Sequence, residues 1–309
     1  MKIVFMGTSE FASVQLSRLI EDGYEIPLVV TQPDRAGNRG KVTFPAVKVT
    51  ALEKGLPILQ PERIRNNEEF LETLREISPD VIVVASYGRI VPKEILELPA
   101  KGCINVHASL LPKLRGASPI QHAILQGDRE AGVTIMMMAE GLDTGDMLSK
   151  AALEIGTSDY PELTDRLAAL GAQLLSDTLP RYMAGEIVPE KQDDASATVT
   201  GIIKKEDGRV DFAAMTAEEI ERRLRAFTPW PGIFCDYEGG ALKLLAVEVL
   251  PVSANALPGA VVRSGKEGLD IACREGVLRV TELQAPGKKR MAAGAFLLGH
   301  RIDPGTMLG

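Results

Sequence analysis

The sequence predicts an α/β protein with a parallel sheet in its first part, followed by a smaller β domain. Two observations carry this prediction: short apolar runs alternate with helical patterns up to about residue 184, and short strand patterns follow one another after residue 231. Strands of a parallel sheet have continuously apolar sequences because helices cover both faces. A chain of 309 residues fits one large domain or two ordinary ones, at about 100–200 residues each.

Apolar runs mark the strands of the first part, and periodic patterns mark its helices. The run KIVFMG ends at a glycine, and Phe11, Leu16 and Leu19 then recur at helical spacing behind Ser9 or Thr8, either of which can cap the helix. The predicted strands are residues 2–7, 26–31, 80–86, 102–108, 133–139 and 147–155. The predicted helices are residues 9–22, 67–77 and 160–184.

The composition changes after the last of these helices. Residues 185–209 are polar and glycine-rich without a sustained period, which is typical of a linker. We therefore predict a first domain over residues 1–189, a linker over 190–206 and a second domain over 207–309.

The second domain is predicted to be mostly β. One helix is expected over residues 216–227, where Thr216 and Glu219 have the spacing of a capping box. Five short strands with Gly, Pro and Ser between them indicate a small β-barrel or sandwich. These strands are residues 232–237, 241–250, 259–264, 268–272 and 276–283.

Composition limits where the protein works. No run of about 18 apolar residues exists, so no membrane span is expected, and the apolar stretch before Gly7 is too short for a signal peptide. The three cysteines are odd in number, far apart and outside any CxxC pair: Cys103, Cys235 and Cys273. We therefore expect a reducing cytoplasm and no structural zinc.

The charge distribution bears on nucleic-acid binding. The net charge of −7 disfavours a nucleic-acid partner, but residues 201–309 carry 15 Lys and Arg against 14 Asp and Glu, so the excess acidity lies in the first 200 residues. Residues 31–49 form a long connection that is either a solvated loop or a contact for a polyanion. Its charged residues are Asp34, Arg35, Arg39, Lys41 and Lys48. Further basic clusters are RRLR at 222–225 and KKR at 288–290.

Two polar residues interrupt the apolar strand CINVH. Asn105 and His107 are two residues apart and therefore share one face of the strand, at its carboxyl end. Ligands of open α/β sheets bind beyond the carboxyl ends of the strands. An amide can stabilise an oxyanion, and an imidazole can transfer a proton near neutral pH. A lone histidine here would be explained by a backbone hydrogen bond, but its pairing with Asn105 favours a catalytic site.

The segment EGLDTGD at 140–146 lies between two predicted strands and carries three carboxylates. By itself it is a polar turn, because Gly and Asp dominate turns. If one of its carboxylates meets Asn105 and His107, the three form an acid–base site. The turn between the first strand and the first helix contains a single glycine, Gly7. The three-glycine fingerprint of dinucleotide-binding proteins is therefore missing, which disfavours an NAD dehydrogenase.

The chain resembles the methionyl-tRNA formyltransferase family. The resemblance begins with INVHASLLPKLRGASPIQHAI and GVTIMMMAEGLDTGDML, and it extends to the basic loop 31–41, YGRIVP, AFTPWPG and LQAPGKKRM, in order along nearly the whole chain. The pattern N-x-H-x-SLLP followed by LDTGD marks the wider group of enzymes that use 10-formyltetrahydrofolate. The C-terminal segments and the basic loop narrow the resemblance to the tRNA enzyme.

The resemblance implies a fold, a reaction and partners. It implies a Rossmann-like catalytic domain and an OB-like C-terminal β-barrel that helps to hold tRNA. The formyl donor would be 10-formyltetrahydrofolate, and the acceptor would be the α-amino group of methionine on initiator methionyl-tRNA. No metal, DNA or membrane partner is implied, and we expect a monomer.

The resemblance also assigns residues to roles. Asn105, His107 and Asp143 form the catalytic set. The folate-binding stretch is Ser109, Leu110, Leu111 and Pro112. The expected tRNA contacts are Arg39, Lys41, Lys288, Lys289 and Arg290.

Two other functions stay open on the sequence alone. A second 10-formyltetrahydrofolate enzyme, acting on a nucleotide amine or an amino sugar, would share the catalytic set, although an enzyme for glycinamide ribonucleotide would not need residues 210–309. An RNA-binding protein without catalysis is disfavoured by the intact set of Asn105, His107 and Asp143.

Overall fold

The structure is a computed structural model that describes residues 1–36, 42–252 and 255–309. These residues divide into two compact units. The first unit comprises Met1–Pro119, Glu130–Glu154 and Leu163–Thr200. The second comprises Ile120–Arg129, Ile155–Glu162 and Gly201–Gly309. Two pieces of the predicted first domain therefore belong to the second unit, which the sequence did not indicate. No helix among the described residues has both the length and the apolar character needed to span a membrane.

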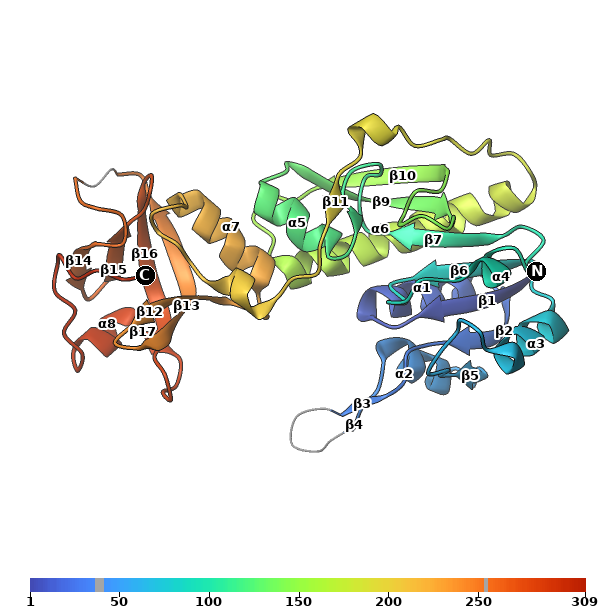
Figure 1. Ribbon diagram of the computed structural model, residues 1–309, viewed down its shortest axis with the longest axis horizontal. Coiled ribbons are helices and arrows are strands. Elements are labelled where there is room, and N and C mark those ends of the chain that lie inside the picture. Colours follow the sequence, from blue (N-terminus) through green and yellow to red (C-terminus); the bar gives the residue numbers. More distant parts are fainter. Residues whose placement is uncertain (37–41, 253–254) are drawn as a thin grey trace. The chain divides into compact units, whose positions relative to one another are not determined.

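The first unit is built on a seven-stranded sheet with the order β10-β9-β7-β6-β1-β2-β5 (Figure 1). Five neighbouring strands are parallel, as predicted, whereas β9 runs antiparallel to both β7 and β10. The short β9–β10 connection explains why these two strands are antiparallel, since only antiparallel strands can be joined without a long crossover. The strands are β1 Lys2–Gly7, β2 Glu25–Val30, β5 Ile58–Leu59, β6 Val81–Ala85, β7 Cys103–His107, β9 Glu130–Met137 and β10 Met147–Glu154.

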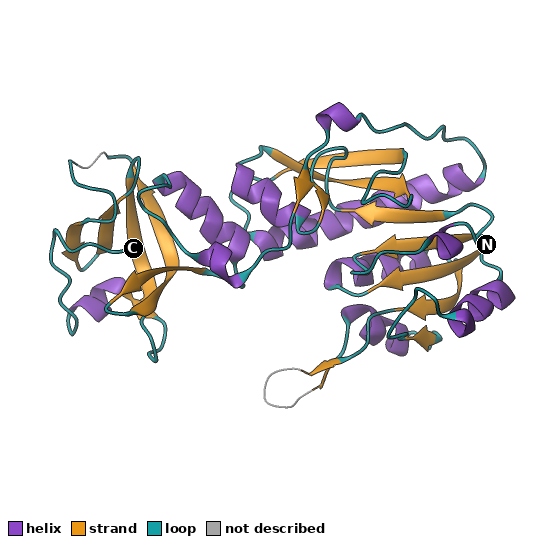
Figure 2. Ribbon diagram, viewed as in Figure 1, coloured by secondary structure: helices purple, strands orange, loops and turns teal. Residues whose placement is uncertain are grey.

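Figure 2 shows the helices of the first unit in purple and its strands in orange. One face of the sheet packs on α3 and α4, since Val4 and Met6 share a buried cluster with Phe70 and Ile95. On the other face, Gly171 of α6 lies against β7 and β9. Burial on both faces explains the continuous apolar runs. The helices are α1 Glu10–Glu21, α2 Ala46–Glu53, α3 Glu68–Ile77, α4 Lys93–Leu96 and α6 Tyr160–Met183. The helix α5 Pro119–Gln126 belongs to the second unit from Ile120 onward.

The basic loop is only partly described. A short antiparallel pair, β3 Arg35–Ala36 and β4 Val42–Thr43, marks its two ends. Arg39 and Lys41, two of the expected tRNA contacts, lie outside the described residues.

Residues 190–200, the larger part of the expected linker, belong to the first unit. Glu190 exchanges two backbone hydrogen bonds of 2.8 Å with Met147. Further along, β11 Val199–Thr200 pairs in parallel with β8 Arg115–Gly116. We call residues 190–200 the strap. The prediction of a linker was wrong for this segment because the strap is held by hydrogen bonds, which leave no apolar periodicity in the sequence.

The second unit contains an antiparallel sheet in the order β12-β13-β16-β15-β14, with β17 beside β16. The C-terminal residues bond to both outer strands of this path: Gly305 N donates to Val261 O (2.8 Å) and Gly309 N donates to Asp236 O (3.4 Å). They thus link the two edges of the antiparallel sheet. The strands are β12 Ile233–Tyr237, β13 Gly240–Leu250, β14 Val261–Gly265, β15 Gly268–Ala272, β16 Val277–Gln284 and β17 Met291–Ala292.

Two helices, α7 Ala217–Phe227 and α8 Ala293–Leu297, complete the second unit. The predicted capping box of α7 is confirmed: Glu219 N donates to Thr216 Oγ1 (3.1 Å), and Thr216 N donates to Glu219 Oε2 (2.7 Å).

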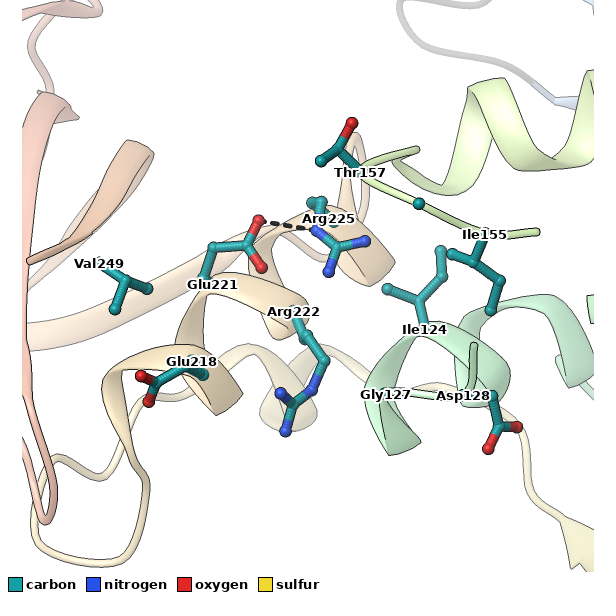
Figure 3. A pocket seen from close by; sticks show the side chains of 11 residues that line it. Ile124, Gly127, Asp128, Ile155, Thr157, Glu218, Glu221, Arg222, Arg225 and Val249 are labelled. Carbon is teal, nitrogen blue, oxygen red and sulfur yellow. Dashed lines mark hydrogen bonds and ion pairs between the residues drawn. The ribbon is translucent and has the colours of Figure 1, made fainter. Parts of the chain in front are cut away.

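The arginines of α7 line a pocket of the second unit (Figure 3). Arg225 bonds to Glu221 (2.7 Å) and to the carbonyl of Ser158 (3.1 Å), while Arg222 donates to the carbonyl of Leu125 (3.4 Å). These arginines attach residues 120–129 and 155–162 to the second unit. The RRLR cluster is therefore structural, and its side chains are committed to protein groups.

Candidate active site

The site begins at the carboxyl end of β7. His107 is 6 % exposed, whereas Asn105 is half-buried. The backbone of Asn105 is held in the sheet between β6 and β9. Its side chain has no hydrogen-bond partner among the residues that the structure describes, so the amide is available to a ligand.

The imidazole of His107 is held on both edges. Nε2 lies 3.1 Å from the carbonyl oxygen of Leu114. A carbonyl oxygen only accepts, so Nε2 carries a proton, and Nδ1 is the nitrogen left for proton exchange. Nδ1 lies 3.7 Å from Oδ2 of Asp143. The structure thus brings together the histidine and the carboxylate that the sequence singled out from segments 36 residues apart.

Asp143 has a strained backbone and a fixed carboxylate. Its φ of 51° lies in the left-handed region, which a residue with a side chain occupies only when its surroundings impose it. Its Oδ2 accepts a hydrogen bond of 2.8 Å from the backbone N–H of Gly116. Two residues later only glycine fits, because a Cβ on Gly145 would lie 1.8 Å from the carbonyl oxygen of Met137.

Sequence reasoning missed two side chains beside this loop. Gln192 of the strap donates to the carbonyls of Asp143 (2.8 Å) and Gly145 (2.7 Å), and it accepts a hydrogen bond from Arg115 (2.9 Å). Both residues are buried. No local signal marks them, because their partners lie far away in the chain.

The expected folate-binding stretch forms a rigid turn after His107. Ser109 Oγ donates to the carbonyl of Lys113 (2.7 Å), and Leu111 N donates to Thr134 Oγ1 (3.1 Å). Ser109 and Leu111 are buried, whereas Leu110 and Pro112 are half-buried. Ser109 and Leu111 hold the turn that carries Leu114, the backbone partner of His107.

Two hydroxyl groups lie buried near the same edge of the sheet. Thr31 follows β2 and Tyr87 follows β6, and neither hydroxyl has a hydrogen-bond partner among the described residues. Parallel strands end at one edge of the sheet, so these groups lie at the edge to which β7 brings His107. No cluster of three or more His, Cys, Asp or Glu side chains able to hold a metal ion exists within the described ranges.

Three of the expected tRNA contacts lie in the connection between β16 and β17. Lys288, Lys289 and Arg290 are all exposed. Arg290 forms an ion pair with Glu282, so it is partly neutralised. Lys288 and Lys289 therefore present the freer positive charge.

Cys103 shares the strand of Asn105 and His107, but it packs in the core with Val4 and Met6. Burial raises the pKa of Cys103, Cys235 and Cys273 to about 12 each. Only about one thiol in 10⁴ is then a thiolate at pH 8, and the thiolate is the reactive form.

We therefore expect iodoacetamide at pH 8 to leave the folded protein active and unlabelled by peptide mass spectrometry, while the urea-unfolded protein is labelled at all three cysteines. Rapid labelling of Cys103 in the folded protein would contradict this account of the core.

Comparison with known proteins identifies the family. Two family models match in order: the formyl transferase model over residues 1–179 and the formyl transferase C-terminal domain model over residues 202–301. The chain is 50 % identical to the methionyl-tRNA formyltransferase of Caldanaerobacter subterraneus subsp. tengcongensis over 310 aligned positions, which cover 100 % of both chains. The chain belongs to the methionyl-tRNA formyltransferase family. The resemblance seen in the sequence is confirmed.

Solved structures of other proteins share the fold of this chain. The N-formyltransferase of Helicobacter canadensis, in complex with folinic acid and dTDP-3-aminofucose, matches with a TM-score of 0.70 at 17 % identity, over 91 % of this chain and 98 % of its own. HypX of Aquifex aeolicus, in complex with tetrahydrofolic acid, matches with a TM-score of 0.64 at 17 % identity, over 99 % of this chain and 50 % of its own. At this identity the likeness establishes the fold alone.

Proposed function

We propose that this protein transfers the formyl group of 10-formyltetrahydrofolate to the α-amino group of methionine on initiator methionyl-tRNA. The observation that carries the proposal is the meeting of His107 and Asp143 beside the unpartnered amide of Asn105, in a chain that aligns end to end with a methionyl-tRNA formyltransferase.

The acceptor amine attacks the formyl carbon in its neutral form, and its nitrogen then carries a positive charge and must lose one proton. Nδ1 of His107 is suited to take that proton, because Nε2 is hydrogen-bonded to the carbonyl of Leu114. The carboxylate of Asp143, 3.7 Å away, stabilises the imidazolium that results. Protonated His107 can then return the proton to the leaving folate nitrogen.

Attack on the formyl carbon produces a tetrahedral intermediate with a negatively charged oxygen. The amide N–H of Asn105 is the donor for this oxyanion, since no described residue competes for it. The chain needs no covalent nucleophile for this sequence of steps, and its buried thiols are poorly suited to supply one.

The donor is proposed to bind at the carboxyl edge of the sheet, near Thr31 and Tyr87, whose buried hydroxyls lack partners among the described residues. The half-buried Leu110 and Pro112 are proposed to contact it from the turn after β7. Ser109 and Leu111 support that turn from within. A folate-derived donor is consistent with the tetrahydrofolic acid in the related HypX structure.

The two predicted domains divide the work in this proposal. Residues 1–189 hold the donor and the catalytic set, and residues 207–309 help to hold tRNA. The strap lies between these two segments in the sequence and packs as part of the first unit. The proposed tRNA contacts are Arg39, Lys41, Lys288, Lys289 and Arg290. We propose that the protein acts as a cytoplasmic monomer, without DNA.

Acceptor specificity tests the function. Initial rates with 10-formyltetrahydrofolate should be high with charged initiator tRNA, and they should be at background with uncharged tRNA, glycinamide ribonucleotide and a nucleotide-linked amino sugar. Comparable rates with one of the small amines would replace the tRNA acceptor with that amine.

Replacing Lys288 and Lys289 by alanine is expected to raise the KM for methionyl-tRNA about 5–30-fold at 150 mM salt, with kcat little changed, because each lost phosphate contact removes a counterion-release term. The slope of log KM against log salt should fall by about 0.7–0.9 per lysine. Steady-state rates over a salt series measure both quantities.

The matched control removes two exposed positive charges elsewhere, Lys54 and Arg65 of the first unit. An equal change of KM in the control would show a general charge effect. An unchanged KM in the Lys288 and Lys289 variant would remove these lysines from the tRNA contact.

A further inference from the structure

Gln192 fastens the strap to the loop that carries Asp143. Its Nε2 donates to the carbonyl oxygens of Asp143 (2.8 Å) and Gly145 (2.7 Å), on either side of Thr144. The side chain is almost fully buried, with 5 % of the residue exposed. Both N–H donors of the amide therefore serve the loop.

Arg115 fixes which way this amide points. Its Nε donates to Oε1 of Gln192 at 2.9 Å, and a guanidinium can only donate. The amide oxygen must therefore face Arg115 and the NH₂ group must face the loop. Arg115 is itself held by Asp194 (2.8 Å) and by the pairing of β8 with β11.

The loop needs such support. Asp143 occupies the left-handed region with a φ of 51°, a conformation that persists only when neighbouring contacts stabilise it. The Gly116 N–H holds the carboxylate of Asp143, but it does not hold the loop backbone. Gln192 supplies that hold, at the carbonyl of Asp143 itself.

We propose that Gln192 is a positioning residue for formyl transfer: it fixes the backbone of the Asp143 loop so that the carboxylate stays beside Nδ1 of His107. The role rests on the proposed function of this site. Gln192 acts through Asp143 and does not touch the reacting atoms. The strap is then part of the active site, and Arg115 orients the side-chain amide of Gln192.

The variant Gln192→Glu tests this role because it keeps the shape of the side chain and the acceptor for Arg115, while it removes both donors to the loop. We expect the single-turnover rate to fall about 10–100-fold, as for a catalytic group displaced by about 1 Å. The Kd values of donor and acceptor should stay within about twofold of wild type, because in this proposal Gln192 affects the position of Asp143 in the chemical step and not the binding of either substrate.

The control is Gln173→Glu on α6. Gln173 also accepts from an arginine, Arg18 (3.1 Å), and donates to an acid, Asp177 (2.9 Å), but it lies outside the site. Its variant should transfer formyl at the wild-type rate. If Gln192→Glu does not fold, Gln192→Met removes the same two donors with an uncharged side chain of similar length, although it also removes the acceptor for Arg115.

A double-mutant cycle separates positioning from general stability. In an Asp143→Ala background, Gln192→Glu should change the rate by less than about twofold, since its effect passes through Asp143. A further tenfold loss in that background would overturn the proposal, as would a wild-type rate for the folded single variant. Wild-type protein is assayed in parallel: its failure to formylate methionyl-tRNA would count against the proposed function, and normal transfer would keep the test of Gln192 independent.

Discussion

Replacing His107 by asparagine is expected to lower the single-turnover rate of formyl transfer by about 10²–10⁴-fold, the usual loss when a general acid–base group is removed. His107 is the buried imidazole whose Nδ1 faces Asp143, and it is the group to which the proposed mechanism assigns the proton of the acceptor amine. Rapid-quench measurements at saturating donor and acceptor would isolate the chemical step.

The control for this prediction is His300→Asn. His300 is exposed in the second unit, where its ring stacks on Phe296. The His300→Asn variant should transfer formyl at the wild-type rate. A His107→Asn rate within about threefold of wild type would exclude His107 from proton transfer, since removal of a true acid–base group costs far more.

Replacing Asn105 by alanine is expected to lower the same rate on the order of 10²–10³-fold, as for the loss of one oxyanion donor. The amide of Asn105 has no partner within the described part of the chain, so the variant should leave no protein group unsatisfied. Its unfolding midpoint should therefore remain close to that of the wild type, and the loss should appear in kcat rather than in donor binding.

Asn255→Ala, at an exposed position of the second unit, serves as the matched change. Near-wild-type turnover of Asn105→Ala would remove Asn105 from the mechanism. A large loss of thermal stability would instead assign Asn105 a structural role.

The sequence predicted much of the fold because its signals are local. Buried parallel strands require continuous apolar runs, and this requirement located β1, β2, β6 and β7 within one or two residues. The capping box of α7 depends on residues three apart, and it was found for the same reason. The antiparallel direction of β9 was missed, since the direction of a strand leaves no mark in its own sequence.

The residues of the site likewise include some with a local sequence signal and some without one. Asn105 and His107 were predicted because strand parity places them together, whereas the choice of Asp143 among the three carboxylates of residues 140–146 came from the family resemblance. Gln192 could not be predicted, because its contact with Asp143 spans 49 positions and its bond with Arg115 spans 77. Such contacts use polar side chains and backbone carbonyls, which look the same in a linker and in a buried strap.

One measurement tests the central claim most directly: a single turnover with formyl-labelled 10-formyltetrahydrofolate, excess protein and methionine-charged initiator tRNA. The account predicts that the label moves to the methionine amino group at a rate that depends on Asn105, His107 and Asp143 together. Release of labelled formate without transfer, or transfer to a small amine in preference to methionyl-tRNA, would contradict it.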